Sequence, residues 1–229
     1  MPGASQPVYS QQTEVHEKLA AIVQRHIRHD FQKVIARHTL AAFEEVAKIV
    51  ANQNLPLILD SGCGTGLSTF QIAKSHPDHF VLGIDKSGHR LAKTPDDDRE
   101  PANCSFVRAD LIDFWRLAVR ANWRVAKHFL LYPNPWPKKN HLQRRFHAHP
   151  VFPDLVRLGE KFILRSNWNI YLQEFSAAFE LATSFKSQVR QIQVQTPMTL
   201  FEKKYHDSGH AIYELLIEKD GSLEKFGLA

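Results

Sequence analysis

The stretch Leu57-Ile-Leu-Asp-Ser-Gly-Cys-Gly-Thr-Gly66 decides the fold class of this chain of 229 residues. Its apolar run predicts a buried strand that ends at Asp60, and the glycine cluster then leads into a helical pattern that continues to about Lys74. Glycines at such a turn let the backbone bend sharply and approach a ligand that a Cβ atom would exclude. The stretch therefore predicts the ligand-binding edge of an α/β sheet.

Three more strands follow along the chain. The apolar runs are Phe80–Ile84, Phe106-Val107 and Val125–Tyr132, and they are closed by Asp85, Asp110 and Pro133. Helical patterns of roughly 10 to 20 residues separate them, which is typical of a doubly wound, mostly parallel sheet. After a fifth strand at 161–165 and a helix over about 168–185, residues 191–194 and 211–219 alternate between apolar and polar, which predicts an antiparallel pair at the sheet edge.

The N-terminal part differs from the rest in its periodicity. Apolar residues recur at helical spacing from Val15 to Ile27 and again from Val34 to Val50. We therefore expect two units: a polar tail with a helical layer over residues 1–50, and the sheet-containing domain over residues 51–229. Within the second unit, the acidic run 96–98 predicts a solvated loop.

The composition excludes several classes of protein. Lys and Arg number 29 against 24 Asp and Glu, and this net charge of +5 is compatible with a polyanionic partner without requiring one. Two cysteines cannot form a disulfide scaffold or a four-thiolate zinc site. No run approaches the roughly 18 apolar residues of a membrane span, and the first residues lack the layout of a signal peptide. We therefore expect a cytoplasmic protein without membrane contact.

Acidic residues stand at the ends of three successive strands. Because the carboxyl ends of parallel strands meet at one edge of the sheet, Asp60, Asp85 and Asp110 are expected close together. Asp85 is placed to accept both hydroxyls of an adenosine ribose, and Asp110 to accept from an adenine amino group. Three carboxylates suit a cationic ligand such as a sulfonium and would repel a polyphosphate. The simpler alternative is a glycine-rich turn with helix-capping aspartates.

The fourth strand runs into a rigid aromatic turn, Tyr132-Pro-Asn-Pro-Trp-Pro-Lys-Lys139. Alternating prolines hold this turn extended at the ligand-binding edge. Trp136 offers a flat face for a nucleobase, and Asn134 offers one donor and one acceptor. The segment from Lys138 to His149 carries four Lys or Arg and three His but no acid, which suits a phosphate backbone. The alternative is an ordinary solvated basic loop.

Four segments appear in an order that one enzyme family shares. They are Asp60–Gly66, Gly83-Ile-Asp85, Tyr132-Pro-Asn-Pro-Trp-Pro-Lys-Lys-Asn-His-Leu-Gln-Arg-Arg145, and Thr199-Leu-Phe-Glu-Lys-Lys204 with Gly209-His210. This set closely resembles the tRNA (guanine-N7)-methyltransferases over residues 40 to 219. The glycine loop is shared by many methyltransferases, whereas the Pro-x-Pro-Trp-Pro-Lys-Lys block followed by Thr-x-Phe-Glu is specific to this family.

The resemblance implies a Rossmann-like class I methyltransferase fold, S-adenosylmethionine as the cofactor and tRNA as the partner. The methyl group would go to N7 of the variable-loop guanosine, at position 46 of tRNA. The implied cofactor residues are Asp60, Gly62, Gly64, Gly66, Asp85, Asp110 and Asn134, with Asn134 also the catalytic position. The implied substrate residues are Trp136, Lys138, Asn140, His141, Arg144, Arg145, Asn167, Thr199, Phe201 and Glu202, of which Glu202 would accept guanine N1–H and N2–H.

Two positions depart from the family pattern. Asn134 stands where the family has Asp in its Pro-Asp-Pro-Trp block, and Ser166-Asn167-Trp168 stands where it has Thr-Asp-Trp. Both changes remove charge that could stabilise the cationic 7-methylguanine. The sequence therefore leaves two alternatives open: a paralogue that methylates another nucleobase, for example at an exocyclic amine, or a non-catalytic tRNA-binding protein.

No metal site is expected, although the chain has 13 histidines. His206 and His210 are four residues apart, but Gly209 interrupts any helix between them. The histidines at 141, 147 and 149 lie among cations, which would repel a metal ion. We expect a monomer or a homodimer, and a non-catalytic partner subunit stays open.

Overall fold

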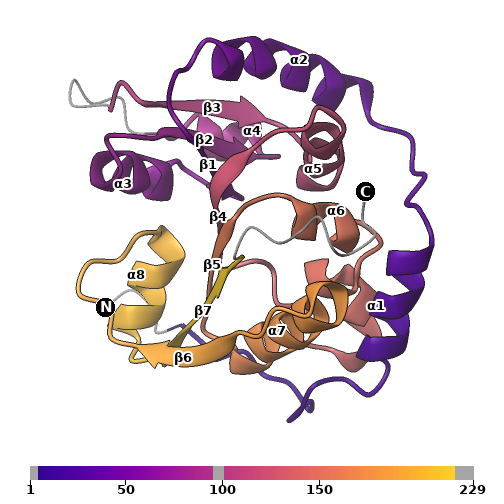
Figure 1. Cartoon of the computed structure of the whole chain (residues 1–229). Helices are drawn as coiled ribbons and strands as arrows, with labels where there is room; N and C mark the ends of the chain where they lie inside the picture. The colour runs from indigo at the N-terminus through magenta and orange to yellow at the C-terminus, as the bar shows by residue number, and fades with distance from the viewer. Residues whose placement is uncertain (1–4, 95–100, 220–229) are drawn as a thin grey trace.

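A computed structural model describes residues 5–94 and 101–219 of the chain. Its centre is one sheet of seven strands in the order β3-β2-β1-β4-β5-β7-β6 (Figure 1). The strands are β1 (Leu57–Ser61), β2 (Phe80–Asp85), β3 (Cys104–Arg108), β4 (Val125–Leu131), β5 (Lys161–Ser166), β6 (Gln188–Ile192) and β7 (Ile212–Glu218). The acidic run 96–98, predicted to be a loop, lies outside the described residues.

The pairing of the strands follows the predicted pattern. Strands β1 to β5 are parallel, and β7 lies antiparallel between β5 and β6. The expected α/β class, with a doubly wound sheet and an antiparallel C-terminal edge, is confirmed. The strand predicted at residues 191–194 lies earlier in the structure, at Gln188–Ile192. It pairs with β7 from Gln188, opposite Leu216, to Ile192, opposite Ile212.

Helices cover both faces of the sheet. They are α1 (Leu19–Arg28), α2 (Arg37–Ala51), α3 (Leu67–Ser75), α4 (Gly88–Leu91), α5 (Leu111–Arg120), α6 (Phe152–Arg157), α7 (Asn169–Thr183) and α8 (Leu200–Asp207), with 3₁₀ turns η1 (Lys139–Arg144) and η2 (Phe146–Ala148). Helices α3 and α8 lie on one face, and α1, α5, α6 and α7 lie on the other (Figure 1). Each helix in the described part of the chain is too short or too polar to span a lipid bilayer.

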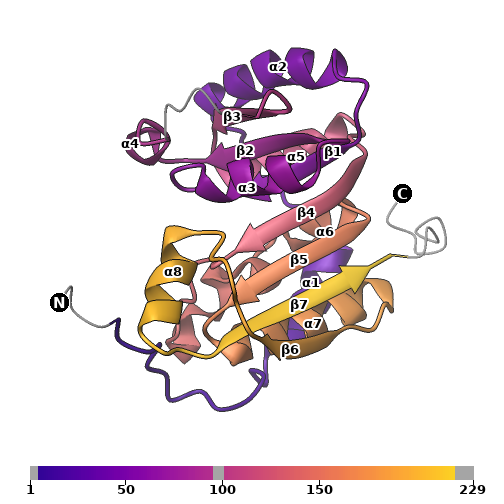
Figure 2. The ribbon, with the colours of Figure 1, turned by 90° about the vertical axis from the view of Figure 1, so that its left-hand side faces the viewer.

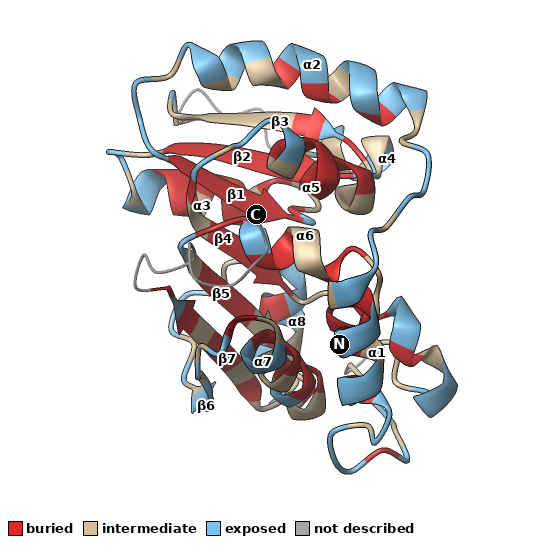
Figure 3. Cartoon of the chain, turned by 45° about the vertical axis from the view of Figure 1, so that its right-hand side comes forward, coloured by how far each residue is buried: buried red, intermediate tan, exposed pale blue. Residues whose placement is uncertain are grey.

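The core forms because the central strands are buried on both faces. Every residue of β1 and β2 is buried, as expected for parallel strands between two helical layers (Figure 3). Helix α2 buries one stripe and exposes the opposite side to solvent. On that stripe the Phe43 ring stacks on Trp123 at 4.9 Å and meets the edge of Phe114 at 5.2 Å, which fixes α2 against α5.

The two N-terminal helices cover different parts of the sheet. Helix α1 packs against α6 and α7, whereas α2 packs against α5 and β3. Both helices are shorter than their apolar patterns, since Val15 precedes α1, and Val34 and Ile35 precede α2. Residues 29–36 cross between the two packing sites outside any helix, and Val34 there is 85% exposed. The division of the chain at residue 50 stays a prediction.

The parallel strands all point toward one edge of the molecule. In Figure 2 the arrowheads of β2, β4 and β5 face the side where α4 and α8 lie. Strand order reverses between β1 and β4, and ligands of open α/β sheets bind where that reversal occurs, outside the carboxyl ends of the strands. The glycine turn after β1 and the proline-rich turn after β4 both lie at this edge.

Candidate active site

A cavity of about 680 Å³ opens where the strand order reverses. One wall comes from β1, β2 and the start of α5, with Ser61, Gly62, Asp85, Lys86, Arg90, Asp110, Leu111 and Ile112. The facing wall comes from β4, the turn after it and more distant segments, with residues 130–136, Arg144, Phe146, His149, Asn167, Phe201 and Tyr205. The size is that of a pocket for a cofactor-sized ligand.

The glycine turn after β1 has a left-handed backbone at three positions. Gly62, Gly64 and Gly66 have φ of 83°, 63° and 80°, a region that side chains with a Cβ rarely adopt. Only Gly62 lines the cavity. A Cβ on Gly66 would come within 2.8 Å of the Phe106 ring, so Gly66 allows α3 to pack closely on the sheet. Gly64 donates its N–H to Asp85, which fixes the turn to the end of β2.

Asp85 is held at the rim of the cavity by three donors. Its Oδ2 accepts from the backbone of Gly64 at 3.0 Å, and its Oδ1 accepts from the backbone of Ser87 at 2.8 Å. The guanidinium of Arg90 lies 3.0 Å from the same Oδ1. Arg90 was not anticipated from the sequence, because the helix that carries it, α4, is only one turn long.

Asp110 also lines the cavity, and it begins α5. Its Oδ1 accepts from the backbone N–H groups of Ile112 and Asp113, the geometry of a helix N-cap. Thr39 on α2 accepts from the Asp110 backbone N–H at 3.3 Å. The capping role and the cavity position therefore coexist in one residue.

Asp60 lies beneath the glycine turn, outside the cavity. Its carboxylate is 1% exposed and accepts from the Ser68 and Thr69 hydroxyls at 2.6 and 2.7 Å. Burial raises the pKa of Asp60 to about 6. This placement corrects the expectation that Asp60 faces the ligand: it anchors the first turn of α3 to the end of β1.

The turn after β4 places amide and aromatic groups on the facing wall. Tyr132 and Trp136 have left-handed φ of 52° and 45°, and Asn134 Oδ1 accepts from the Trp136 N–H at 3.4 Å. The guanidinium of Arg144 lies over the Trp136 ring at 4.8 Å, and the His141 ring meets it edge-on. A base that stacks on Trp136 would use the ring face away from Arg144.

Two further segments complete that wall. Asn167 follows β5, and its Nδ2 lies 3.3 Å from His210 Nδ1. On α8, Phe201 is 51% exposed at the cavity and stacks on Tyr205, which in turn stacks on His210. Tyr205 was not predicted as a site residue, although its spacing of four residues from Phe201 places both on one helix face.

The sequence matches known proteins over most of its length. A family model described as "Putative methyltransferase" matches residues 54–215, more than half of the chain. The chain belongs to this family. The predicted family resemblance and enzyme class are thereby confirmed: the protein is a methyltransferase.

Curated relatives of the methyltransferase carry a more specific name. A tRNA (guanine-N(7)-)-methyltransferase of Nitrosococcus oceani is 29% identical over 181 residues, which cover 74% of each chain. One of Pseudoalteromonas atlantica is 26% identical over 181 residues, which cover 74% of this chain and 75% of that protein.

Solved structures share the fold of the methyltransferase. The crystal structure of the 16S rRNA methyltransferase KamB has a TM-score of 0.54 at 14% identity, covering 82% of this chain and 95% of that one. The aminoglycoside resistance methyltransferase NpmB1 has a TM-score of 0.52 at 19% identity, covering 77% and 93%. These likenesses confirm the Rossmann-like class I methyltransferase fold.

Arg145 of the methyltransferase is fully buried, so it cannot touch RNA in this conformation. Its guanidinium forms an ion pair with Glu174 and donates to the carbonyl of Trp136. The predicted RNA-contacting segment is therefore corrected at this position. Its neighbours Lys138, Asn140 and Arg144 are exposed, and His141 is half-buried.

Glu202 is also fully buried. Its Oε1 accepts from the hydroxyl of Tyr132 and from Arg165, and its Oε2 accepts from the backbone of Met198. Thr199 caps α8 by accepting from the Glu202 N–H at 2.9 Å. Glu202 does not line the cavity, and both of its carboxylate oxygens accept from the protein itself, which corrects the expectation that Glu202 is open to guanine. The sequence contains Thr-x-x-Glu, the capping-box pattern, which accounts for the bond from the Glu202 N–H to Thr199; the Glu202 side chain accepts from Met198, one residue before the cap.

His149 is a further polar residue on the wall of the cavity. Burial lowers the pKa of His149 to about 4, so this histidine is an uncharged wall residue at neutral pH. Among the described residues, no three His, Cys, Asp or Glu side chains lie where they could hold a metal ion.

Proposed function

We propose that the protein methylates N7 of a guanosine in tRNA, with S-adenosylmethionine as the methyl donor and the variable-loop guanosine at position 46 as the target. The observation that carries the proposal is that one cavity joins two sets of groups. Asp85, Asp110 and Gly62 lie on one wall, and Asn134, Trp136 and Asn167 lie on the other. The names of the curated relatives support tRNA as the substrate and guanine N7 as the methylated atom.

The first wall fits S-adenosylmethionine. The Asp85 carboxylate is buried but borders the cavity, where it can accept from ribose hydroxyls. Leu111 and Ile112 offer apolar contact, and Asp110 keeps one carboxylate oxygen free of the helix cap. When bound, the cofactor supplies an electrophilic methyl group.

The second wall fits a purine. Trp136, Phe201 and Tyr205 present aromatic surface to the same cavity, on which an unstacked base can stack. Guanine N7 has an in-plane lone pair and no proton to lose, so no general base is required and the residues need only hold N7 in line with the methyl group. The exposed cations Lys138, Lys139 and Arg144 extend from this wall and suit tRNA phosphates.

The test is methyl transfer to tRNA that lacks the modification. The protein is incubated with S-adenosylmethionine labelled in the methyl group and bulk tRNA from a strain without 7-methylguanosine, and the nucleosides are then separated. We expect label in 7-methylguanosine for the unaltered protein and for Asp78→Asn, which lies on the surface, and little for Asp85→Asn. Sequencing of the labelled tRNA then tests position 46.

Other outcomes would replace the proposal. Label in another nucleoside would establish a paralogue with a different target base. The amide of Asn134 would then be the first group to examine. Binding of tRNA without any label would establish a non-catalytic tRNA-binding protein. A cytoplasmic location is part of the proposal because tRNA is its substrate.

A further inference from the structure

The proline-rich turn has a left-handed backbone at both of its ends, a conformation that the residues there do not favour by themselves. Tyr132 and Trp136 have φ of 52° and 45°, and neither is glycine. Such residues persist in the left-handed region only where the surroundings determine the conformation. At the Tyr132 end the phenol hydroxyl is tied to Glu202.

The Trp136 end is held by a buried arginine. The Nε and Nη2 atoms of Arg145 donate to the Trp136 carbonyl at 3.2 and 3.1 Å, a two-pronged contact that fixes the peptide plane. The guanidinium also lies over the ring of Trp168 at 4.8 Å. Arg145 therefore connects the turn after β4 with the start of α7.

Glu174 on α7 holds Arg145 in place. Its Oε2 accepts from Arg145 at 2.5 Å and lies 2.9 Å from the His147 ring nitrogen. Burial of Glu174 is outweighed by the hydrogen bonds from His147 and Arg145 and by the charge of Arg145, and the pKa of Glu174 is held below its usual value. The pair is therefore an ionised one, sealed from solvent.

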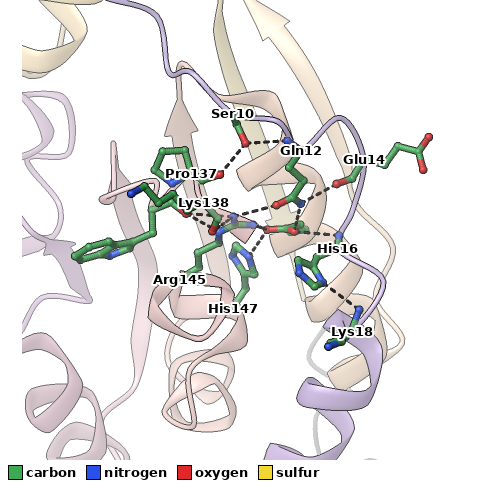
Figure 4. A network of polar contacts seen from close by, with 11 residues as sticks. Ser10, Gln12, Glu14, His16, Lys18, Pro137, Lys138, Arg145 and His147 are labelled. Atoms are coloured by element: carbon green, nitrogen blue, oxygen red, sulfur yellow. Dashed lines mark hydrogen bonds and ion pairs between the residues drawn. The ribbon is translucent and has the colours of Figure 1, made fainter. Parts of the chain in front are cut away.

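The N-terminal segment completes this cluster from 130 or more positions away in the sequence (Figure 4). Gln12 is buried; it donates to Glu174 Oε1 at 2.6 Å and accepts from Arg145 at 3.0 Å. The backbone of His16 donates to the same Glu174 oxygen, and the Ser10 hydroxyl donates to the carbonyl of Pro137 at 2.7 Å. The segment 10–16 thus touches both the turn and the ion pair that holds it.

We propose that Gln12, Arg145 and Glu174 are positioning residues that hold Trp136 against the methyl-acceptor site, and that segment 10–16 is a working part of that site. The inference rests on the proposed function for its kinetic consequence. Arg145 acts on Trp136 through the Trp136 carbonyl, and Gln12 and Glu174 act through Arg145; none of the three lines the cavity. Removing one partner of a buried ion pair is strongly destabilising, whereas Gln12 carries no charge, so a change at Gln12 separates the positioning role from a purely stabilising one.

The test compares Gln12→Met and Glu174→Gln with matched controls. Gln12→Met keeps the length of the side chain and removes its hydrogen bonds, and Gln11→Met makes the same change at an exposed neighbour. Glu180→Gln repeats the Glu174→Gln change at an exposed site of α7. Each protein is labelled with 5-fluorotryptophan, and the Trp136 signal is assigned by its loss in Trp136→Phe.

We expect the fluorine signal of Trp136 to shift in both test variants while that of Trp123, which packs on Phe43 and Phe114, stays in place. At a temperature where each variant is folded, kcat for tRNA should fall by about tenfold or more, because a small misplacement of a reacting group is costly. The dissociation constant for S-adenosylmethionine should change by less than about twofold.

An unmoved Trp136 signal together with an unchanged kcat in Gln12→Met would overturn the proposal, as would equal effects in Gln11→Met and Glu180→Gln. If Glu174→Gln does not fold, Gln12→Met decides alone. The fluorine signal needs no turnover, so it still tests the positioning role if the unaltered protein transfers no methyl group to tRNA. In that case the proposed function fails, and the role of the cluster is judged separately.

Discussion

Asp60 is the residue whose surroundings differ most from what its place in the sequence suggests. It is buried beneath the glycine turn, and its pKa is raised from 3.8 to about 6. An acid with a raised pKa in the folded protein binds more protons when folded than when unfolded between these two values. Stability should therefore fall as the pH rises from 4 to 6 and then stay level.

Replacing Asp60 by Asn should remove this loss. The amide oxygen can still accept from Ser68 and Thr69, whereas no charge has to be buried. Relative to the unaltered protein, Asp60→Asn should gain up to about 3 kcal/mol in unfolding free energy between pH 4 and pH 7. Urea unfolding at several pH values measures this, with exposed Glu45→Gln on α2 as the control. A constant difference across the pH range would contradict the assignment.

Asn134 and Asn167 are the two positions where a charge could improve the reaction. Both line the cavity. Both carry an amide where the tRNA (guanine-N7)-methyltransferases, which the sequence resembles, have a carboxylate. A carboxylate there would stabilise the positive charge that develops on the purine. Asn134→Asp with Asn167→Asp should raise kcat by up to about a hundredfold, since one such contact is worth about 3 kcal/mol. Single-turnover rates measure it, and a slower double variant would count against the charge argument.

At the scale of the element, η1 ends between two adjacent arginines that have different roles. Arg144 points outward over Trp136, whereas Arg145, one residue on, is buried against Glu174. Only the first is available to a phosphate backbone. The basic character of this segment therefore overstates the number of cations that can reach RNA.

Arg144→Ala should weaken tRNA binding and lower the slope of log affinity against log salt by about one. The change removes a single exposed charge from the rim of the cavity. Arg28→Ala on α1, also exposed, is the matched control and should leave the slope nearly unchanged if α1 stays clear of the tRNA. Filter binding at several salt concentrations gives the slope. Equal slopes for the unaltered protein and Arg144→Ala would exclude Arg144 from the phosphate contact.

The elements that could be predicted from the sequence are those that depend on residues close to one another in the chain. Strand β2, which ends at Asp85, and strand β3, which ends two residues before Asp110, follow from apolar runs and the acids after them, and the turn at 133–137 follows from its prolines. The partners of Arg145 and Glu202 could not be predicted in the same way. Glu174 is 29 positions from Arg145 and Arg165 is 37 positions from Glu202, so only the assembled fold brings these charges together.

At the scale of the whole molecule, ligand binding should stabilise the fold. The cavity draws its walls from segments between residues 61 and 205, so a ligand that fills it holds together elements from both halves of the sheet. A ligand at 100 times its dissociation constant contributes about 2.7 kcal/mol. For a chain of this size that raises the melting temperature by roughly 5 to 10 °C.

Thermal unfolding with S-adenosylhomocysteine measures this shift without turnover. Asp85→Asn should lose most of the shift, because Asp85 borders the cavity, whereas Asp60→Asn should keep it, because Asp60 lies below the turn. A shift that survives in Asp85→Asn and disappears in Asp60→Asn would reverse the roles given to the two acids. The unaltered protein without ligand is the reference.

The contact of Gln12 with Glu174 also has a consequence for the timing of synthesis. A ribosome makes segment 10–16 first, yet its partners at 137, 145 and 174 leave the exit tunnel much later. Segment 10–16 therefore lacks these partners until residues up to 174 have been translated. The aromatic turn gains its final bend only after that closure, so an incomplete chain on the ribosome lacks the arrangement that we assign to methyl transfer.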